Sequence, residues 1–432
     1  MASKTQTGQA RFQRAERRQM EMRFLALDQM IPQDHPARLV WAYVDGLDLT
    51  EFYQQIQAVE GRAGRDPIDP KILLGLWLLA TIDSITSARQ IERLCDEHFG
   101  YKWMCGGVSV NHHTLSDFRH QKSAFLDGLL TQSVAVLLHQ DLIDLKRVAQ
   151  DGMRVRASAG SNSFRRQPTL EKCLEEAEKH LAKLKEEAEQ DAEAENRRSR
   201  AARLRAAEER KERIARALAE REKLVPSMER RQKGSSVDAR VSTTDPEARK
   251  MKMGDGGFRA AYNVQFATTA DSLVIVGVDV TNQGTDGGLL RPMVEQLKER
   301  YGQLPDEYLA DAGFVHLDDI KQLTEWGVTP YLPIKDEKKK KSTGVDPYAA
   351  KAGDSPEVIA WRARMGTEEA QEIYKDRSAT AEFPNATARN RNFRQLNVRG
   401  LLKAHAASLW QALAHNFQRT LDLRQKANLA PV

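Results

Sequence analysis

The chain contains 432 residues, of which 41% are hydrophobic and 29% are charged, and its net charge is +5. This length allows two or three domains with buried cores, and the composition fits a globular protein with one unusually charged segment. The three cysteines include no CxxC pair, which argues against a disulfide framework, and the longest apolar run, residues 72–82, is too short to cross a bilayer.

The first segment, residues 1–30, is polar and basic. It lacks the apolar core of a signal peptide, so together with the cysteine usage it favours a protein of the reducing cytoplasm. Two interpretations of its charge stay open. It is either a solvated tail or helix, or an arm that contacts a nucleic-acid backbone.

Residues 31–145 are predicted to form helices. Pro70 is expected to open an apolar helix, because proline suits the first helical turn. An amphipathic helix over residues 87–98 is followed by a Gly106-Gly107 break and a further helix, for which Thr114 is the expected cap. The pair is either a helix-turn-helix or part of a plain packed helical domain. The long connection favours the packed domain, and the cysteines and histidines here match no closed zinc pattern.

A short strand over residues 148–157 delivers Asp151 to what is predicted to be a glycine turn at Gly152. The following segment, residues 168–228, is of a different kind. Apolar residues step by four and three through it, and nearly all other positions are Glu, Lys, Arg or Ala, which is typical of a coiled coil. A polar patch at residues 190–196 interrupts the apolar seam. Two antiparallel helices are therefore favoured over one long rod, and no chemistry is assigned to them.

Residues 230–335 alternate between strands and helices. Strands are predicted over 272–280, 307–310 and 328–334, and helices over 289–301 and 317–325. This order predicts a mixed sheet flanked by helices. The second of these strands ends at Asp311. A loop rich in lysine is expected over residues 335–355, followed by helix to the end of the chain with an interruption near Pro384.

Three acids are candidates for one site. Asp151 and Asp311 each stand where an apolar strand meets glycine or Ala-Gly, and Glu382 lies on a predicted helix. Either aspartate alone is most simply a turn residue, but the pair with a downstream glutamate is more specific. Oxygen ligands of this kind suit Mg²⁺, and two such ions about 3.5–4 Å apart promote phosphodiester cleavage.

Several stretches of the chain resemble the DDE-type transposases of bacterial insertion sequences, whose catalytic core is RNase H-like. Residues 151–157 resemble the family's strand that carries the first aspartate, and residues 242–249 resemble the segment before the next strand. Residues 262–265 and 279–286 also follow the family's sequence closely. Residues 309–314 carry the second aspartate. The stretches at 34–36 and 114–119 resemble the helical domain that precedes such a core.

The resemblance implies an α+β fold: an N-terminal helical domain (1–145) for DNA binding or dimerisation and an RNase H-like catalytic domain (146–432) interrupted by the coiled-coil insertion. It implies that Asp151, Asp311 and Glu382 are catalytic residues and ligands of two Mg²⁺ ions, for which Mn²⁺ can substitute. Tyr374, Arg377 and Arg389 would hold the DNA phosphate. Two departures bear on this. Arg389 replaces the usual lysine, and four residues rather than three separate Arg377 from Glu382.

A basic stretch follows Glu382 and contains Arg389, Arg391, Arg394, Arg399 and Lys403. It is expected to lie on one helix and either contact the DNA backbone or form a solvated basic face.

The function that these features predict is DNA transposition: cleavage at the terminal inverted repeats of an insertion sequence and strand transfer into target DNA. The expected partners are double-stranded DNA and a second copy of the chain in a synaptic homodimer, with no membrane. The expected location is the bacterial cytoplasm, in association with the nucleoid. The alternatives are a catalytically inactive relative or regulator that binds DNA without cutting it, and a structural protein dominated by its coiled coil.

Overall fold

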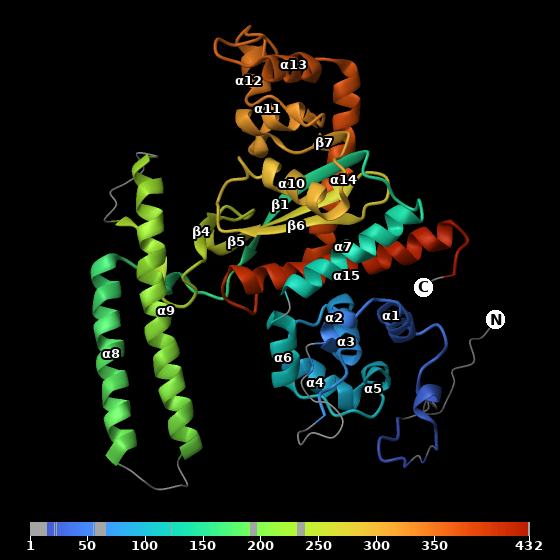
Figure 1. The fold of residues 1–432 in the computed structure, drawn as a ribbon, viewed down its shortest axis with the longest axis vertical. Coiled ribbons are helices and arrows are strands. Elements are labelled where there is room, and N and C mark those ends of the chain that lie inside the picture. The colour runs from blue at the N-terminus through green and yellow to red at the C-terminus, as the bar shows by residue number, and fades with distance from the viewer. Residues whose placement is uncertain are drawn as a thin grey trace, which may run out of the picture.

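The computed structural model describes residues 15–430 apart from positions 21, 23, 55, 57–65, 122, 191–196 and 231–237. Most of the predicted N-terminal basic arm therefore lies outside the described residues. Figure 1 shows three parts: a cluster of short helices, a sheet with helices packed around it, and a long helical hairpin that stands beside the sheet. This is the predicted mixed α+β fold with an inserted hairpin.

The helical cluster is built around one almost completely buried helix. Its helices are α1 (Pro36–Asp45), α2 (Thr50–Gln54), α3 (Pro70–Ile82), α4 (Ala88–Glu97), α5 (Phe99–Cys105), α6 (His112–Gln121) and α7 (Ser123–His139), after a short 3-10 turn, η1 (Leu27–Met30). Apart from Lys71, helix α3 is apolar on all sides and is buried from Pro70 to Thr81, as expected for a central helix. Pro70 opens it, as predicted, and Asp69 caps it.

Two details of this cluster differ from the sequence-based predictions. Helix α5 lies between α4 and α6, so no short turn joins them and the packed helical domain is the correct alternative. The prediction that Thr114 caps α6 is wrong. The helix starts at His112, and the side chain of Asn111 accepts a hydrogen bond from the Thr114 amide at 2.9 Å. Asparagine is as good a cap as threonine, and here it stands directly before the helix.

The sheet has the strand order expected of an RNase H-like core. Its strands are β1 (Arg147–Arg156), β4 (Arg249–Lys252), β5 (Phe258–Thr269), β6 (Ile275–Thr281), β7 (Glu307–Leu309) and β8 (Thr329–Tyr331). The order is β4-β5-β1-β7-β8, with β6 also paired to β5. Strands β1, β7 and β8 are parallel, whereas β5 is antiparallel to β1 and to β6. Strand β1 is therefore central. The short strands β2 (Phe164–Arg165) and β3 (Val241–Ser242) pair separately.

The insertion between β2 and β3 is an antiparallel helical hairpin, as predicted, made of α8 (Gln167–Gln190) and α9 (Arg197–Arg230). We call it the arm. Ion pairs cross it in antiparallel order, Lys211 to Glu178 at 3.1 Å and Lys185 to Glu208 at 3.7 Å. Its seam buries small and aliphatic side chains: Leu170, Ala177, Leu181, Ala207, Ile214 and Ala217. The residues that join the two helices lie outside the described part of the chain.

The C-terminal half contains six helices. They are α10 (Leu290–Tyr301), α11 (Leu317–Glu325), α12 (Glu337–Ser342), α13 (Pro356–Met365), α14 (Glu368–Asn390) and α15 (Leu401–Lys426). The lysine-rich segment forms α12 rather than a loop. Helix α14 continues through Pro384, so the interruption predicted there is wrong. The break comes at residues 391–400, where Asn392 and Gly400 adopt positive φ angles of 59° and 90°.

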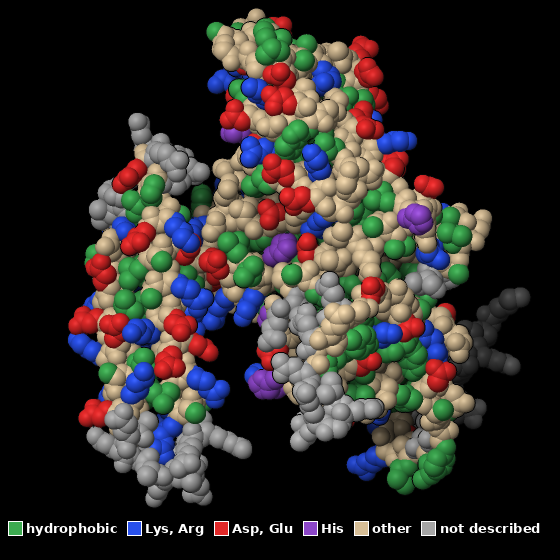
Figure 2. Space-filling view, in the orientation of Figure 1, with side chains coloured by type: hydrophobic (Ala, Val, Ile, Leu, Met, Phe, Trp, Pro, Cys, Tyr) green, Lys and Arg blue, Asp and Glu red, His purple; other side chains and the backbone are tan. Residues whose placement is uncertain are grey.

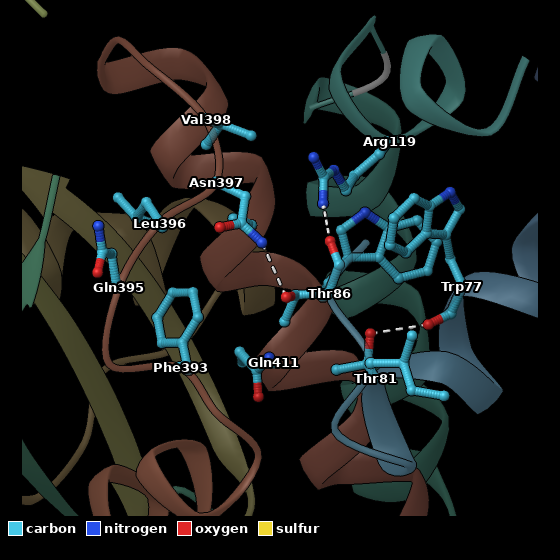
Figure 3. A pocket seen from close by; sticks show the side chains of 13 residues that line it. Trp77, Thr81, Thr86, Arg119, Phe393, Gln395, Leu396, Asn397, Val398 and Gln411 are labelled. Carbon is cyan, nitrogen blue, oxygen red and sulfur yellow. Dashed lines mark hydrogen bonds between the residues drawn. The ribbon is translucent and has the colours of Figure 1, made fainter. Parts of the chain in front are cut away.

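This connecting segment joins the helical cluster to the sheet. Asn397 donates a hydrogen bond to the Thr86 hydroxyl at 2.8 Å, and Arg119 donates to the Thr86 carbonyl at 2.7 Å while lying over the Trp77 ring. Figure 3 shows these side chains around a small pocket, with Phe393 on the opposite wall.

No described helix is long and apolar enough to span a membrane.

Helix α15 completes the free edge of β6 through one side chain. Asn416 accepts a hydrogen bond from the Ile275 amide at 2.8 Å and donates to the Ile275 carbonyl at 2.7 Å. The side chain therefore replaces a missing neighbouring strand at a buried position.

We expect Asn416→Ala to lower the free energy of unfolding by about 2–4 kcal/mol, because it leaves a buried amide and a buried carbonyl unpaired. Urea denaturation followed by circular dichroism would measure this. Gln418→Ala, at an exposed position of the same helix, is the control and should change stability by less than about 0.5 kcal/mol. Equal effects of the two variants would contradict this role of Asn416.

Candidate active site

The register of two parallel strands brings Asp151 and Asp311 to the same level. Strand β1 pairs with β7 so that Ala149 lies opposite Leu309. Carrying this register two residues further along both strands places Asp151 level with Asp311. Asp151 is still within β1, whereas Asp311 follows β7 and caps a short 3-10 turn by accepting a hydrogen bond from the Gly313 amide at 2.6 Å.

Helix α14 supplies the groups that hold Asp151. Asn385 donates to one carboxylate oxygen of Asp151 at 2.9 Å, and Arg377 donates to the other at 3.2 Å. Both Asp151 oxygens are thus engaged by one helix. Burial raises the pKa of Asp151 to about 6, Arg377 opposes the rise, and the nearby Asp311 carboxylate adds to it.

Arg377 lies among all three predicted acids. Besides its bond to Asp151, its guanidinium group is 4.0 Å from an Asp311 oxygen and 3.7 Å from a Glu382 oxygen. The Arg377 side chain is only 13% exposed, whereas that of Glu382 is 61% exposed. Three acids that are far apart in the sequence therefore converge on one cation.

The donor set has the chemistry of a magnesium site. Mg²⁺ prefers carboxylate oxygens and keeps several water ligands, so few protein groups are needed. Among the described residues, no three or more His, Cys, Asp or Glu side chains are arranged to hold a metal ion directly. In this arrangement the guanidinium group of Arg377 provides the positive charge that the acids share.

A buried polar network lies on the face of the sheet opposite Asp151. Gln150 donates to Gln265, and Gln265 donates to Asn263, both at 3.0 Å. These three side chains are fully buried. A Cβ atom at Gly152 would lie 2.3 Å from the Gln265 amide nitrogen. The predicted glycine turn is therefore wrong: β1 runs straight through Gly152, and glycine is required there because the network fills the space of a side chain.

The network ends on an acid that was not predicted to belong to the site. Asp286 accepts hydrogen bonds from Asn263 at 2.6 Å, from Gln265 at 3.0 Å and from Arg154 at 2.8 Å. It also lies close to Gly313, because a Cβ atom at that glycine would be 2.8 Å from an Asp311 oxygen and 3.7 Å from an Asp286 oxygen. Asp286 belongs to one of the stretches that carried the family resemblance, but nothing in its local sequence indicates that it lies next to Asp311.

The other predicted DNA-binding residues lie in different environments. Tyr374 is half-buried one turn before Arg377; burial raises its pKa, Arg377 opposes this, and Asp311 and Asp151 add to it. Arg389 and Arg394 are exposed, Arg389 near the end of α14 and Arg394 in the segment after it. Arg391 is 8% exposed, so the structure does not bring it to the surface with its neighbours. The prediction that the basic stretch lies on one helix is therefore wrong, because α14 ends at Asn390 and α15 begins at Leu401.

Comparison with known families gives two matches. Residues 25–121 match a family described as "Transposase domain (DUF772)", and residues 229–417 match one described as "Transposase DDE domain". No curated protein and no solved structure matches the chain significantly. Asp311, Arg377 and Glu382 lie inside the second match. Asp151 lies outside both, so its place among the acids rests on the strand register and on its contacts with α14.

We expect Gly152→Ala to destabilise the protein by about 1–3 kcal/mol, because the added methyl group would overlap the buried Gln265 amide. Thermal unfolding would measure the loss. Gly160→Ala is the matched control, since no atom lies within 4 Å of its added Cβ, and it should leave the unfolding temperature nearly unchanged. A wild-type unfolding temperature for Gly152→Ala would show that the network has room for a side chain.

Proposed function

Since the chain belongs to the DDE-type transposases of insertion sequences, we propose that it cleaves DNA at the ends of its element and joins these ends to target DNA, using Mg²⁺ or Mn²⁺. The observation that carries the proposal is the convergence of Asp151, Asp311 and Glu382 on the guanidinium group of Arg377. Acids gathered around one cation at the end of parallel strands supply the ligand set that metal-dependent phosphoryl transfer requires.

In this proposal the three acids hold two divalent ions. When bound, such ions activate the attacking hydroxyl and stabilise the leaving oxygen. The protein positions the acids beforehand: Asn385 fixes the orientation of the Asp151 carboxylate, and the Gly313 amide fixes that of Asp311. Glu382 is the most exposed of the three and the freest to move toward the aspartates.

Arg377 has two successive partners in this scheme. Without divalent ions its charge offsets that of the acids, which would otherwise repel one another. With divalent ions bound, their charge would take over this role, and the guanidinium group, whose planar fork suits phosphate, would be available to a DNA phosphate. Tyr374, one turn away, lies beside the same position.

The substrates are double-stranded DNA: the terminal inverted repeats of the element and the target. We place Arg389 and Arg394 against the phosphate backbone, since both are exposed close to the acids in the chain. Arg391 is buried and is not part of this contact. Synapsis of two ends calls for a homodimer. The protein would act in the bacterial cytoplasm, in association with the nucleoid.

We expect Asp151→Asn, Asp311→Asn and Glu382→Gln each to reduce strand cleavage roughly 100-fold or more, the effect of removing a group that stabilises transition-state charge. Nicking of a plasmid that carries the element ends, with and without Mg²⁺, would measure this, and DNA binding should persist. Asp318→Asn, at a 91% exposed site on α11, is the control. Wild-type cleavage by any of the three variants would remove that residue from the site. A wild-type protein that binds but never cuts would be an inactive relative.

We expect Arg377→Met to lower the unfolding temperature in EDTA by several degrees, because three carboxylates lose their shared cation. Millimolar Mg²⁺ should then raise the unfolding temperature of this variant more than that of the wild type, since metal replaces the missing charge. Arg389→Met, at an exposed position of the same helix, should behave like the wild type. An equal response of both variants to Mg²⁺ would contradict the proposed exchange.

A further inference from the structure

A groove open to solvent lies where the arm meets the body of the protein. One wall is the face of α9 that carries Arg213, Arg216 and Lys223, and the other is the turn at residues 244–247 with the start of α15 at 399–403. Figure 2 shows Lys and Arg side chains gathered on the side of the arm that faces the body, above the gap that separates the arm from the helical cluster.

The acids of this groove are already bound by protein groups. Glu220 pairs with Arg249 at 2.5 Å and with Lys223 at 2.7 Å. Asp245 accepts from the Tyr262 hydroxyl at 2.7 Å and from the Gly400 amide at 3.2 Å. Glu247 accepts from the Leu401 amide at 3.0 Å, and Glu209 lies 3.8 Å from Arg213. These acids stabilise the walls: Glu220 and Glu209 are paired with cations, whereas Asp245 and Glu247 are held by neutral donors.

Three cations of the groove are not offset in this way. Arg216 on the arm and Arg399 and Lys403 on the body are exposed. Within the described part of the chain, no ion pair or hydrogen bond engages any of their side chains. The groove therefore presents exposed cations without an ion-pair partner in the described chain on two opposite walls, which favours an extended polyanion over a small anion that would need converging donors.

The arm is held in place against the body. The Glu220–Arg249 ion pair joins α9 to β4, and both side chains are 13% exposed. Arg166, at the start of the arm, pairs with Asp238, just after it, at 2.7 Å. The basic face of α9 thus has a defined position relative to the sheet, as one wall of a binding channel requires.

The chain also connects the groove to the acids. From the end of α14, which carries Glu382, the exposed residues Arg389 and Arg394 lead along the connecting segment to Arg399 and Lys403. Exposed cations therefore follow the chain from the acidic site to the groove.

We propose that the groove between α9 and the start of α15 binds the sugar-phosphate backbone of double-stranded DNA, so that the arm is one wall of a DNA channel rather than a spacer. This inference rests on the proposed function and assigns the arm a part in it. The contact is sequence-independent, because it is made by charges on phosphates.

The test uses the full-length protein with Arg216→Glu, Arg399→Glu and Lys403→Glu combined. The control combines Lys172→Glu, Lys298→Glu and Lys321→Glu. It reverses the same charge at exposed positions, one on the arm and two on the body, outside the residues that line the groove. Lys172 lies on α8, and Figure 1 shows α8 on the far side of α9 from the sheet. Binding of a random-sequence duplex of about 30 base pairs is measured by fluorescence anisotropy in EDTA over a range of salt concentrations.

We expect the groove variant to bind the duplex at least roughly tenfold more weakly than the wild type. The slope of log K plotted against log salt concentration should fall in magnitude by about 2–3, as expected for three lost phosphate contacts. The control should stay within about twofold of the wild type at the same salt. Hydrogen exchange of the wild type should show DNA-dependent protection over residues 209–223 and 399–403.

Equal weakening by both variants, no weakening by the groove variant, or preference of the groove for single strands would overturn this proposal. Because binding is measured without divalent ions, it is independent of cleavage. A wild type that binds and cuts DNA while the groove variant binds normally would disprove the groove alone. A wild type that binds no duplex at all would count against the proposed function itself.

Discussion

The structure depends on one partly buried carboxylate on the central strand of the sheet. Asp151 lies on the central strand, and both of its oxygens are bound by side chains of α14, which belongs to the far end of the chain. A buried charge is tolerated only when it is paired and hydrogen-bonded. The position of α14 across β1 is thus dictated as much by this acid as by apolar packing. The same helix brings Arg377 within reach of the other two acids.

The two faces of β1 use their polar residues differently. On one face, Asp151 meets a cation and an amide at the margin of the protein. On the other, Gln150 joins a chain of fully buried amides that ends on Asp286. Such networks are stable only when nearly every member is satisfied. They also leave little freedom of movement, which keeps the strand that carries Asp151 in one place. Gly152 marks the point where this demand excludes any side chain.

The arm shows how a large insertion can be accommodated without disturbing such a core. It leaves the sheet after β2 and returns at β3, two short strands that pair with each other. Its seam is closed by small residues and by ion pairs between α8 and α9, so it needs little burial against the body. Arg213, Arg216 and Lys223 of α9 line the groove between the arm and the body. This is why its charge distribution, and not its helical character, points to a DNA contact.

The local sequence was sufficient for most of the secondary structure. The four-three spacing of apolar residues determined the hairpin, because this pattern reflects interactions between near neighbours in the chain. The strand before Asp311 was also predicted, whereas Asp151 lies within β1 and not at the end of a strand before a glycine turn. The acids themselves were identified by family resemblance, and spacing alone could not have chosen Glu382 among many glutamates. The break at residues 391–400 was missed, because Pro384 looks like a helix breaker while the positive φ angles of Asn392 and Gly400 leave little trace in the sequence.

Tertiary structure alone decided which groups meet. The register of β1 against β7, the placement of Arg377 among three acids, the approach of Asp286 to Gly313 and the burial of Arg391 all join positions that are distant in the chain or turn a side chain inward. Local pattern carries no information on such contacts, because they depend on how whole elements pack. The sequence indicated which residues could do chemistry, and the packing of α14 on the central strand decided which of them lie together.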